Sequence, residues 1–141
     1  MFFITGMSTF TWILVAYVGL YLGHDYIGFL KGQNFSEVLN FTVYTHHMGS
    51  KAFVVRLSEL FLIVGSLALF IEVSKAATTK NFSGTETLLS FLISVVFVIL
   101  FFMVPWAQNA TFLILTLMSF IDATGGFVIE LNAAQRDFHI G

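Results

Sequence analysis

The sequence predicts an all-α integral membrane protein, an antiparallel bundle of four transmembrane helices with an interfacial segment between the first and second helices. Two observations lead to this fold class. Hydrophobic residues make up 57% of the 141-residue chain and charged residues only 10%, whereas a globular domain in water carries roughly 25% charged residues. The apolar residues also gather into stretches that are long enough to cross a hydrocarbon layer of roughly 30 Å. We therefore treat residues 1–141 as a single membrane domain.

The first predicted span covers approximately 8–30, and Ser8 or Thr9 can cap its start. Gly19 and Gly23 form a GxxxG pair on one helical face, which lets another helix approach closely. That approach serves either packing within the chain or a seam between two copies. The sequence leaves both readings open.

The segment 31–50 is too polar for hydrocarbon and too apolar for a plain loop, so we expect it to lie in the membrane interface. Ser36 could cap a short interfacial helix. Leu39, Phe41 and Val43 also alternate as they do in a strand. A helix and a strand therefore remain alternatives for this interfacial loop.

The second predicted span covers approximately 53–73. Arg56 and Glu59 are three residues apart, so they can pair with each other near the entry side of this helix. Gly65 and Glu72 belong to a stripe of small and polar residues at helical spacing. Such a stripe is expected to face protein rather than lipid.

The third predicted span, approximately 88–104, contains no charged residue. Ser83 and Glu86 have the spacing of a capping box, which predicts a helix start just before it. Pro105 ends the span because proline cannot continue the helical hydrogen bonds. Very few residues separate Trp106 from the next apolar stretch, so the third and fourth spans are expected to form a tight antiparallel hairpin.

The fourth predicted span, approximately 109–131, carries a carboxylate at Asp122, a little past the middle of the bilayer. An ionisable group there costs about 2.5–3.5 kcal/mol on insertion scales, which makes it a candidate functional residue. Ser119, Asp122 and Gly126 share one helical face, where Gly126 lets a neighbouring helix approach. Residues 132–141 are expected to form a short polar tail.

Asp122 and Glu72 are predicted at the same side of the membrane. If their helices touch, the two carboxylates can form a proton- or cation-binding pair. No basic residue is expected at the depth of Asp122, because Arg56 lies toward the other side and Lys75 beyond the second span. Asp122 is therefore protonated or locally hydrogen-bonded, paired with another subunit, or part of an ion path.

His24, His46 and His47 are predicted near the opposite side of the membrane, together with Glu59. Imidazoles and carboxylates from two spans can bind a divalent metal, and two histidines can ligate a haem. Interfacial histidines are, however, commonly just polar residues at headgroup depth. We predict no cofactor, with haem or a divalent metal as the alternative.

The composition and motifs favour some function classes over others. The chain lacks a phosphate loop, a nucleophile elbow and a zinc-protease helix, so we do not expect an enzyme. It has no basic block that would bind nucleic acid. The expected partners are the lipid bilayer and either other membrane protein subunits or further copies of the chain.

These patterns predict a small polytopic subunit with a structural or accessory role in a larger membrane assembly or homo-oligomer. One alternative is a small ion or proton channel or transporter that uses Asp122 and Glu72. Another is a haem- or metal-binding membrane anchor that uses His24 with His46 or His47. The expected location is a bacterial inner (plasma) membrane. Positive charges are balanced on the two sides, and the simple polar segments near the termini favour cytoplasmic termini.

Overall fold

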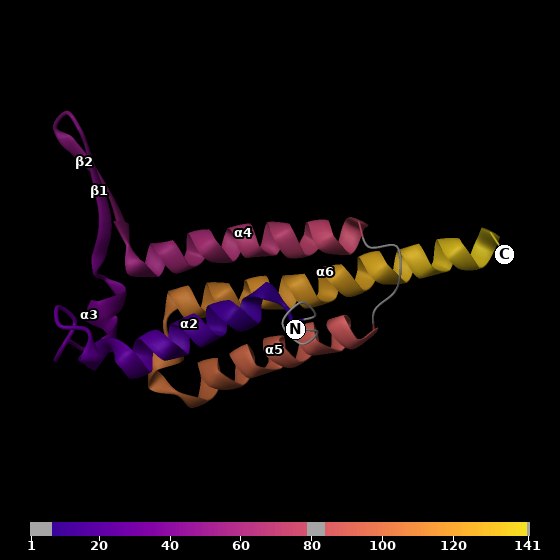
Figure 1. The fold of residues 1–141 in the computed structure, drawn as a ribbon, viewed down its shortest axis with the longest axis horizontal. Helices are drawn as coiled ribbons and strands as arrows, with labels where there is room; N and C mark the ends of the chain where they lie inside the picture. The colour runs from indigo at the N-terminus through magenta and orange to yellow at the C-terminus, as the bar shows by residue number, and fades with distance from the viewer. Residues whose placement is uncertain (1–6, 79–83, 141) are drawn as a thin grey trace.

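The protein is mainly helical, with a small two-stranded sheet at one end (Figure 1). The computed structural model describes residues 7–78 and 84–140, with only the backbone described from 136 onward. Within these ranges three helices are long and apolar enough to cross a membrane. They are α4 (Leu57–Thr78), α5 (Gly84–Met103) and α6 (Ala110–Ile140). This is compatible with a membrane-embedded protein, whereas the predicted bundle of four spans is not confirmed.

The first predicted span is shorter than expected. Helix α2 (Thr9–Gly23) has 15 residues and is therefore about 22 Å long, less than the hydrocarbon layer requires. It ends at Gly23, a residue type that disfavours helix, and the short 3-10 turn His24–Tyr26 follows. Residues 24–30, the last part of the predicted range 8–30, are thus turns, in which the side chains of Tyr26 and Phe29 are exposed.

The predicted interfacial loop 31–50 contains both a helix and a strand. Helix α3 (Phe35–Leu39) is capped by Asn34, not by Ser36 as expected, because Asn34 and Glu37 form a capping box. The Asn34 backbone N–H donates to Glu37 Oε2 over 3.1 Å. Strand β1 (Thr42–Met48) then begins within a few residues of this helix.

Strand β1 pairs antiparallel with β2 (Lys51–Arg56) to form a hairpin. Gly49 has a φ of +63°, which suits the first position of a two-residue hairpin turn of type II′. The predicted second span, 53–73, is therefore wrong at its start, because residues 53–56 are extended. Helix α4 begins only at Leu57 and continues to Thr78.

The last two helices agree with prediction at the connection between them and differ at the C-terminal end of α6. Helix α5 starts at Gly84, where a helix start was expected, and the expected capping residue Ser83 itself lies outside the described residues. Pro105 opens a 3-10 turn, Pro105–Ala107, that joins α5 to α6 over the short connection predicted. The predicted polar tail 132–141 is helical as far as Ile140, because residues such as Ala133, Ala134 and Gln135 are good helix formers.

Helix α6 lies at the centre of the bundle. It packs against both α4 and α5, and α2 packs against α4 and α5 as well. Buried residues make up 33% of the most apolar stretch of α6, compared with 11% of the corresponding stretches of α4 and α5. Most large apolar side chains of α4 and α5 therefore point outward, as expected for helices whose solvent is lipid.

An aromatic core joins α2 to the turn between α5 and α6. Tyr17 is fully buried, and its ring contacts Phe35, Phe61, Trp106 and Phe112. Its hydroxyl accepts a 2.8 Å hydrogen bond from Asn109 Nδ2. Asn109 also accepts from the backbone N–H of Phe112 and so caps α6. These contacts hold α2 beside α6.

Candidate functional site

The start of α2 lies inside the bundle, part-way along α6 (Figure 1). A helix start leaves four backbone N–H groups without partners in their own helix, and hydrocarbon offers none. Ser8 is the N-cap, and its Oγ accepts from the backbone N–H of Phe10. The same Oγ donates a 2.9 Å hydrogen bond to Asp122 Oδ2. The carboxylate of Asp122 therefore stabilises the first turn of α2.

Glu72 stabilises the same turn from α4. Its Oε1 accepts from the backbone N–H of Thr9 over 2.9 Å and also from the Thr9 hydroxyl. Negative charge beside a helix N-terminus is favourable because the backbone dipoles leave partial positive charge there. Ser8, Glu72 and Asp122 are all buried. The two carboxylates that the sequence singled out thus converge on one helix start.

The position of Lys75 differs most from the sequence expectation. It lies within α4, not beyond the end of the second span, because that helix continues to Thr78. Its Nζ lies 3.4 Å from Glu72 Oε1, and its side chain lines the same cavity as Asp122. A cation therefore does accompany Asp122, which sequence reasoning missed because it ended the helix too early.

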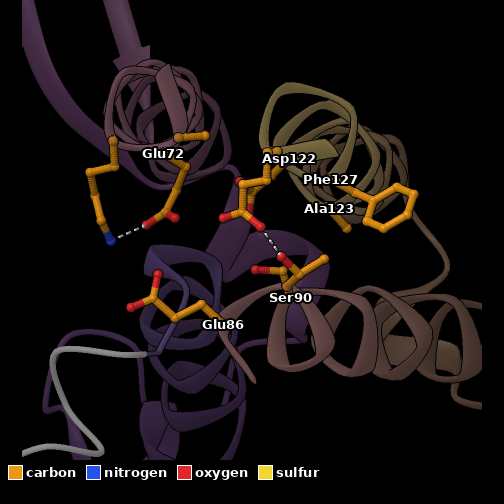
Figure 2. Close-up of a pocket in the computed structure, with 11 residues that line it drawn as sticks. Glu72, Glu86, Ser90, Asp122, Ala123 and Phe127 are labelled. Carbon is orange, nitrogen blue, oxygen red and sulfur yellow. Dashed lines mark hydrogen bonds and ion pairs between the residues drawn. The ribbon is translucent and has the colours of Figure 1, made fainter. Parts of the chain in front are cut away.

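The carboxylates border a small cavity of about 40 Å³ between α4, α5 and α6, large enough for water. Figure 2 shows Glu72, Glu86 and Asp122 pointing into the space between these helices. We call the polar groups of this cavity the carboxylate cluster, and they are Glu72, Lys75, Glu86, Thr87, Ser90, Asp122 and Glu130. Among the described residues that line the cavity, four carboxylates face one ammonium group.

Sequence reasoning missed Glu86, Thr87 and Glu130 as members of this cluster. Thr87 Oγ1 donates to Glu130 Oε2 over 2.5 Å, which ties the first turns of α5 to α6. A signal for Glu130 was available, because it lies eight residues after Asp122 and so on the same helical face. Sequence reasoning did not single it out, because Glu130 lies at the very end of the predicted span 109–131, next to the polar tail expected at 132–141.

Ser119 lies one turn before Asp122 on the inner face of α6 and is 1% exposed. Its Oγ has no hydrogen-bond partner among the described residues, and the same holds for Thr11 Oγ1 on α2. A buried hydroxyl without a partner is uncommon, and an ordered water is the usual explanation. Although Ser119 is close to Asp122 in sequence, it does not line the cavity of the carboxylate cluster.

Arg56 and Glu59 meet in a way that the sequence did not predict. Glu59 Oε2 accepts a 2.9 Å hydrogen bond from the backbone N–H of Arg56, and both residues are exposed. Glu59 thus supplies an acceptor for the chain just before α4 begins. Its contact with Arg56 is that of a helix cap, not an ion pair between side chains.

The three histidines lie apart from the carboxylate cluster. His24 Nδ1 is 2.7 Å from the carbonyl oxygen of Tyr21, while its Nε2 is 3.6 Å from Asp25. His46 and His47 are neighbours on β1 and so face opposite sides of the hairpin. Among the residues described here, no three His, Cys, Asp or Glu side chains are placed to hold a metal ion. Haem or metal binding stays a prediction.

The four glycines singled out for helix packing differ in their surroundings. A Cβ added to Gly65 would lie 2.8 Å from Leu115 Cδ2 and 3.0 Å from Met118 Sδ, so α4 and α6 are in close contact there. Gly126 faces Ala76 at an ordinary distance of 4.0 Å. Gly19 and Gly23 have nothing within 4 Å of such a Cβ, so this pair does not serve packing between the described residues.

The chain matches no protein-family model, no curated protein and no solved structure. A function must therefore be argued from the geometry. Chemically, the carboxylate cluster can hold a helix start in place, and it can also exchange protons or attract cations through its excess of negative groups. These two uses lead to different functions.

Proposed function

We propose that this protein is a structural or accessory subunit of a larger membrane assembly or homo-oligomer. The observation that carries the proposal is the engagement of both intramembrane carboxylates by the start of α2. Asp122 binds Ser8, and Glu72 binds Thr9 and Lys75. These contacts fix the register of α2, α4 and α6 relative to one another. The presence of the two carboxylates therefore does not require a transported ion.

The outer surface of the bundle is consistent with such a role. Many large apolar side chains of α4 and α5 are exposed, and α2 turns Trp12, Val15 and Leu22 outward. Helix α2 is too short to cross the bilayer alone, so the backbone groups at its ends depend on neighbouring helices for hydrogen bonds. The remaining apolar surface is available to lipid and to the apolar helices of other subunits.

Native mass spectrometry of the protein, released from its own membrane in a mild detergent, tests this proposal. We expect a defined complex, either with other subunits or with further copies. Dilution and a second detergent serve as controls for chance association. A protein that remains monomeric in both detergents at every concentration contradicts the proposal.

The carboxylate cluster favours a second candidate function, a small proton or cation path. The cavity contains more carboxylates than ammonium groups and has room for water. In this case uptake of protons, Na⁺ or K⁺ into proteoliposomes is lost in Asp122→Asn and in Glu72→Gln. Arg56→Gln, at the exposed last residue of β2 just before α4, is the matched control and retains uptake. Absence of flux for the unaltered protein rules this candidate out.

A further inference from the structure

The β1–β2 hairpin projects away from the helices at one end of the bundle (Figure 1). Every residue of β1 is exposed, and in β2 only Val55 is partly covered. An isolated two-stranded hairpin is marginally stable at best in water, and it gains stability when one face packs on another surface. The hairpin therefore requires a surface that lies outside the described chain.

The two faces of the hairpin differ in composition. Directly opposed residues of an antiparallel pair share a face. The register places one set together, which we call the apolar hairpin face, formed by Tyr44, His46, Met48, Lys51, Phe53 and Val55. Tyr44 is 54% exposed, Phe53 58% and Met48 66%. The opposite face carries shorter or more polar side chains, which are Thr45, His47, Ala52, Val54 and Arg56.

The hairpin starts at the first residue of α4, one of the three helices that could cross a membrane. Strand β2 runs into α4 without a linker, since Arg56 is its last residue and Leu57 the first of the helix. The backbone N–H of Leu57 also donates to the carbonyl oxygen of Phe41 over 2.8 Å, which fixes the base of the hairpin. From there the strands run across the helix axes rather than along them (Figure 1). If α4 crosses the bilayer, the hairpin follows the bilayer surface.

The charge of the hairpin identifies the kind of surface. Residues 41–56 contain Lys51 and Arg56 but no Asp or Glu. Lys51 lies beside the turn on the apolar hairpin face, where its long side chain can reach phosphate groups while its stem covers apolar surface. Aromatic rings flanked by cations are typical of segments at the headgroup level.

From this geometry we infer that the β1–β2 hairpin lies in the headgroup layer of the bilayer that its own helices cross, with the apolar hairpin face inserted and Lys51 on anionic lipid headgroups. The inference holds whether the protein is an accessory subunit or an ion path. It also gives the exposed rings of Tyr44 and Phe53 an apolar environment.

Single nitroxide labels test the inference in the full-length chain, which contains no cysteine of its own. Phe53→Cys reports on the apolar hairpin face, and its neighbour Ala52→Cys, on the opposite face, is the matched control. Each labelled protein is placed in nanodiscs of phosphatidylcholine with or without phosphatidylglycerol. Collisions with oxygen report burial in lipid, and collisions with a nickel chelate report contact with water.

We expect the label at position 53 to be shielded from nickel several-fold in anionic nanodiscs, while the label at position 52 stays accessible. Lys51→Gln is expected to lower the ratio of surface-bound to unbound hairpin about fivefold, since one Lys or Arg near an anionic surface contributes about that factor. Lys31→Gln, which removes a charge outside the hairpin, leaves the shielding unchanged.

Equal nickel accessibility of both labels in anionic nanodiscs overturns the inference, because the hairpin then stands in water. Dipolar coupling between labels on two chains, rising with protein density, also overturns it in favour of a second copy. Amide hydrogen exchange of residues 42–56 gives an independent test without any substitution. We expect slower exchange in anionic than in neutral nanodiscs, and equal rates contradict the inference.

Discussion

Asp122 and Glu72 owe their places inside the bundle to the polar groups of the α2 start that they satisfy, the Ser8 hydroxyl for Asp122 and the Thr9 backbone N–H for Glu72. Sequence reasoning located both residues, because a carboxylate within an apolar span is conspicuous. It could not identify their partners, because Ser8 is 114 positions away from Asp122 and Thr9 is 63 away from Glu72. One reading left open from sequence, a locally hydrogen-bonded Asp122, describes what the structure contains.

The hydrogen bond between Ser8 and Asp122 leads to a prediction at this scale. A double-mutant cycle with Ser8→Ala and Asp122→Leu should give a coupling free energy of about 0.6–1.7 kcal/mol, the range for such bonds in membrane proteins. Unfolding in mixed micelles measures it. Asp122→Asn should cost less than Asp122→Leu, because the amide oxygen still accepts from Ser8.

Ser66→Ala provides the control for that cycle. Ser66 Oγ donates only within its own helix, to the carbonyl oxygen of Leu62, so its loss should leave stability unchanged within about 0.5 kcal/mol. A coupling energy near zero between Ser8 and Asp122 would show that the first turn of α2 does not depend on the carboxylate.

At the scale of helices and strands, the existence of apolar helices was easier to predict than their ends. Hydropathy continued past Gly23, but the chain there forms turns in which Tyr26 and Phe29 are exposed. In the opposite direction, the polar stretch after Glu130 remains helical, because helix propensity does not require apolar residues. Hydropathy reports the solvent of a segment and not its backbone conformation.

The close contact between α4 and α6 gives a prediction at this scale. Gly65→Ala should lower the free energy of unfolding by about 1–3 kcal/mol, the usual cost of overpacking, because Leu115 is fully buried and cannot move aside easily. Gly19→Ala, where the new Cβ meets nothing, should be neutral. The same unfolding assay compares them, and equal losses would refute the packing argument.

The whole molecule combines a helical body with a hairpin that rests on it at one end only. Composition was sufficient to predict a membrane-embedded helical chain, but the number of spans depended on a single helix, α2, whose length fell short. Of the hairpin, only β1 fell in the predicted interfacial segment, where a strand was one of two alternatives, whereas most of β2 was assigned to the second span. Its strand pairing depends on a turn at Gly49 that hydropathy does not reveal.

Separation of body and hairpin predicts that the bundle folds without the strands. Replacing residues 43–55 by two glycines should change the unfolding midpoint little, within about 0.5 kcal/mol, because Thr42 and Arg56 already lie opposite each other. Circular dichroism and unfolding in neutral micelles check this. A large loss of helix would show that the hairpin is part of the folding core.

The position of the α2 start also constrains how the protein is made. Helix α2 leaves the ribosome first among the described helices, yet its first turn is completed by residues of α4 and α6. Until Asp122 has been synthesised, that helix lacks the acceptor for Ser8, and closing so long a loop adds to the cost of early folding. We therefore expect α2 to dock after α4 and α6 have formed, although it is translated before them.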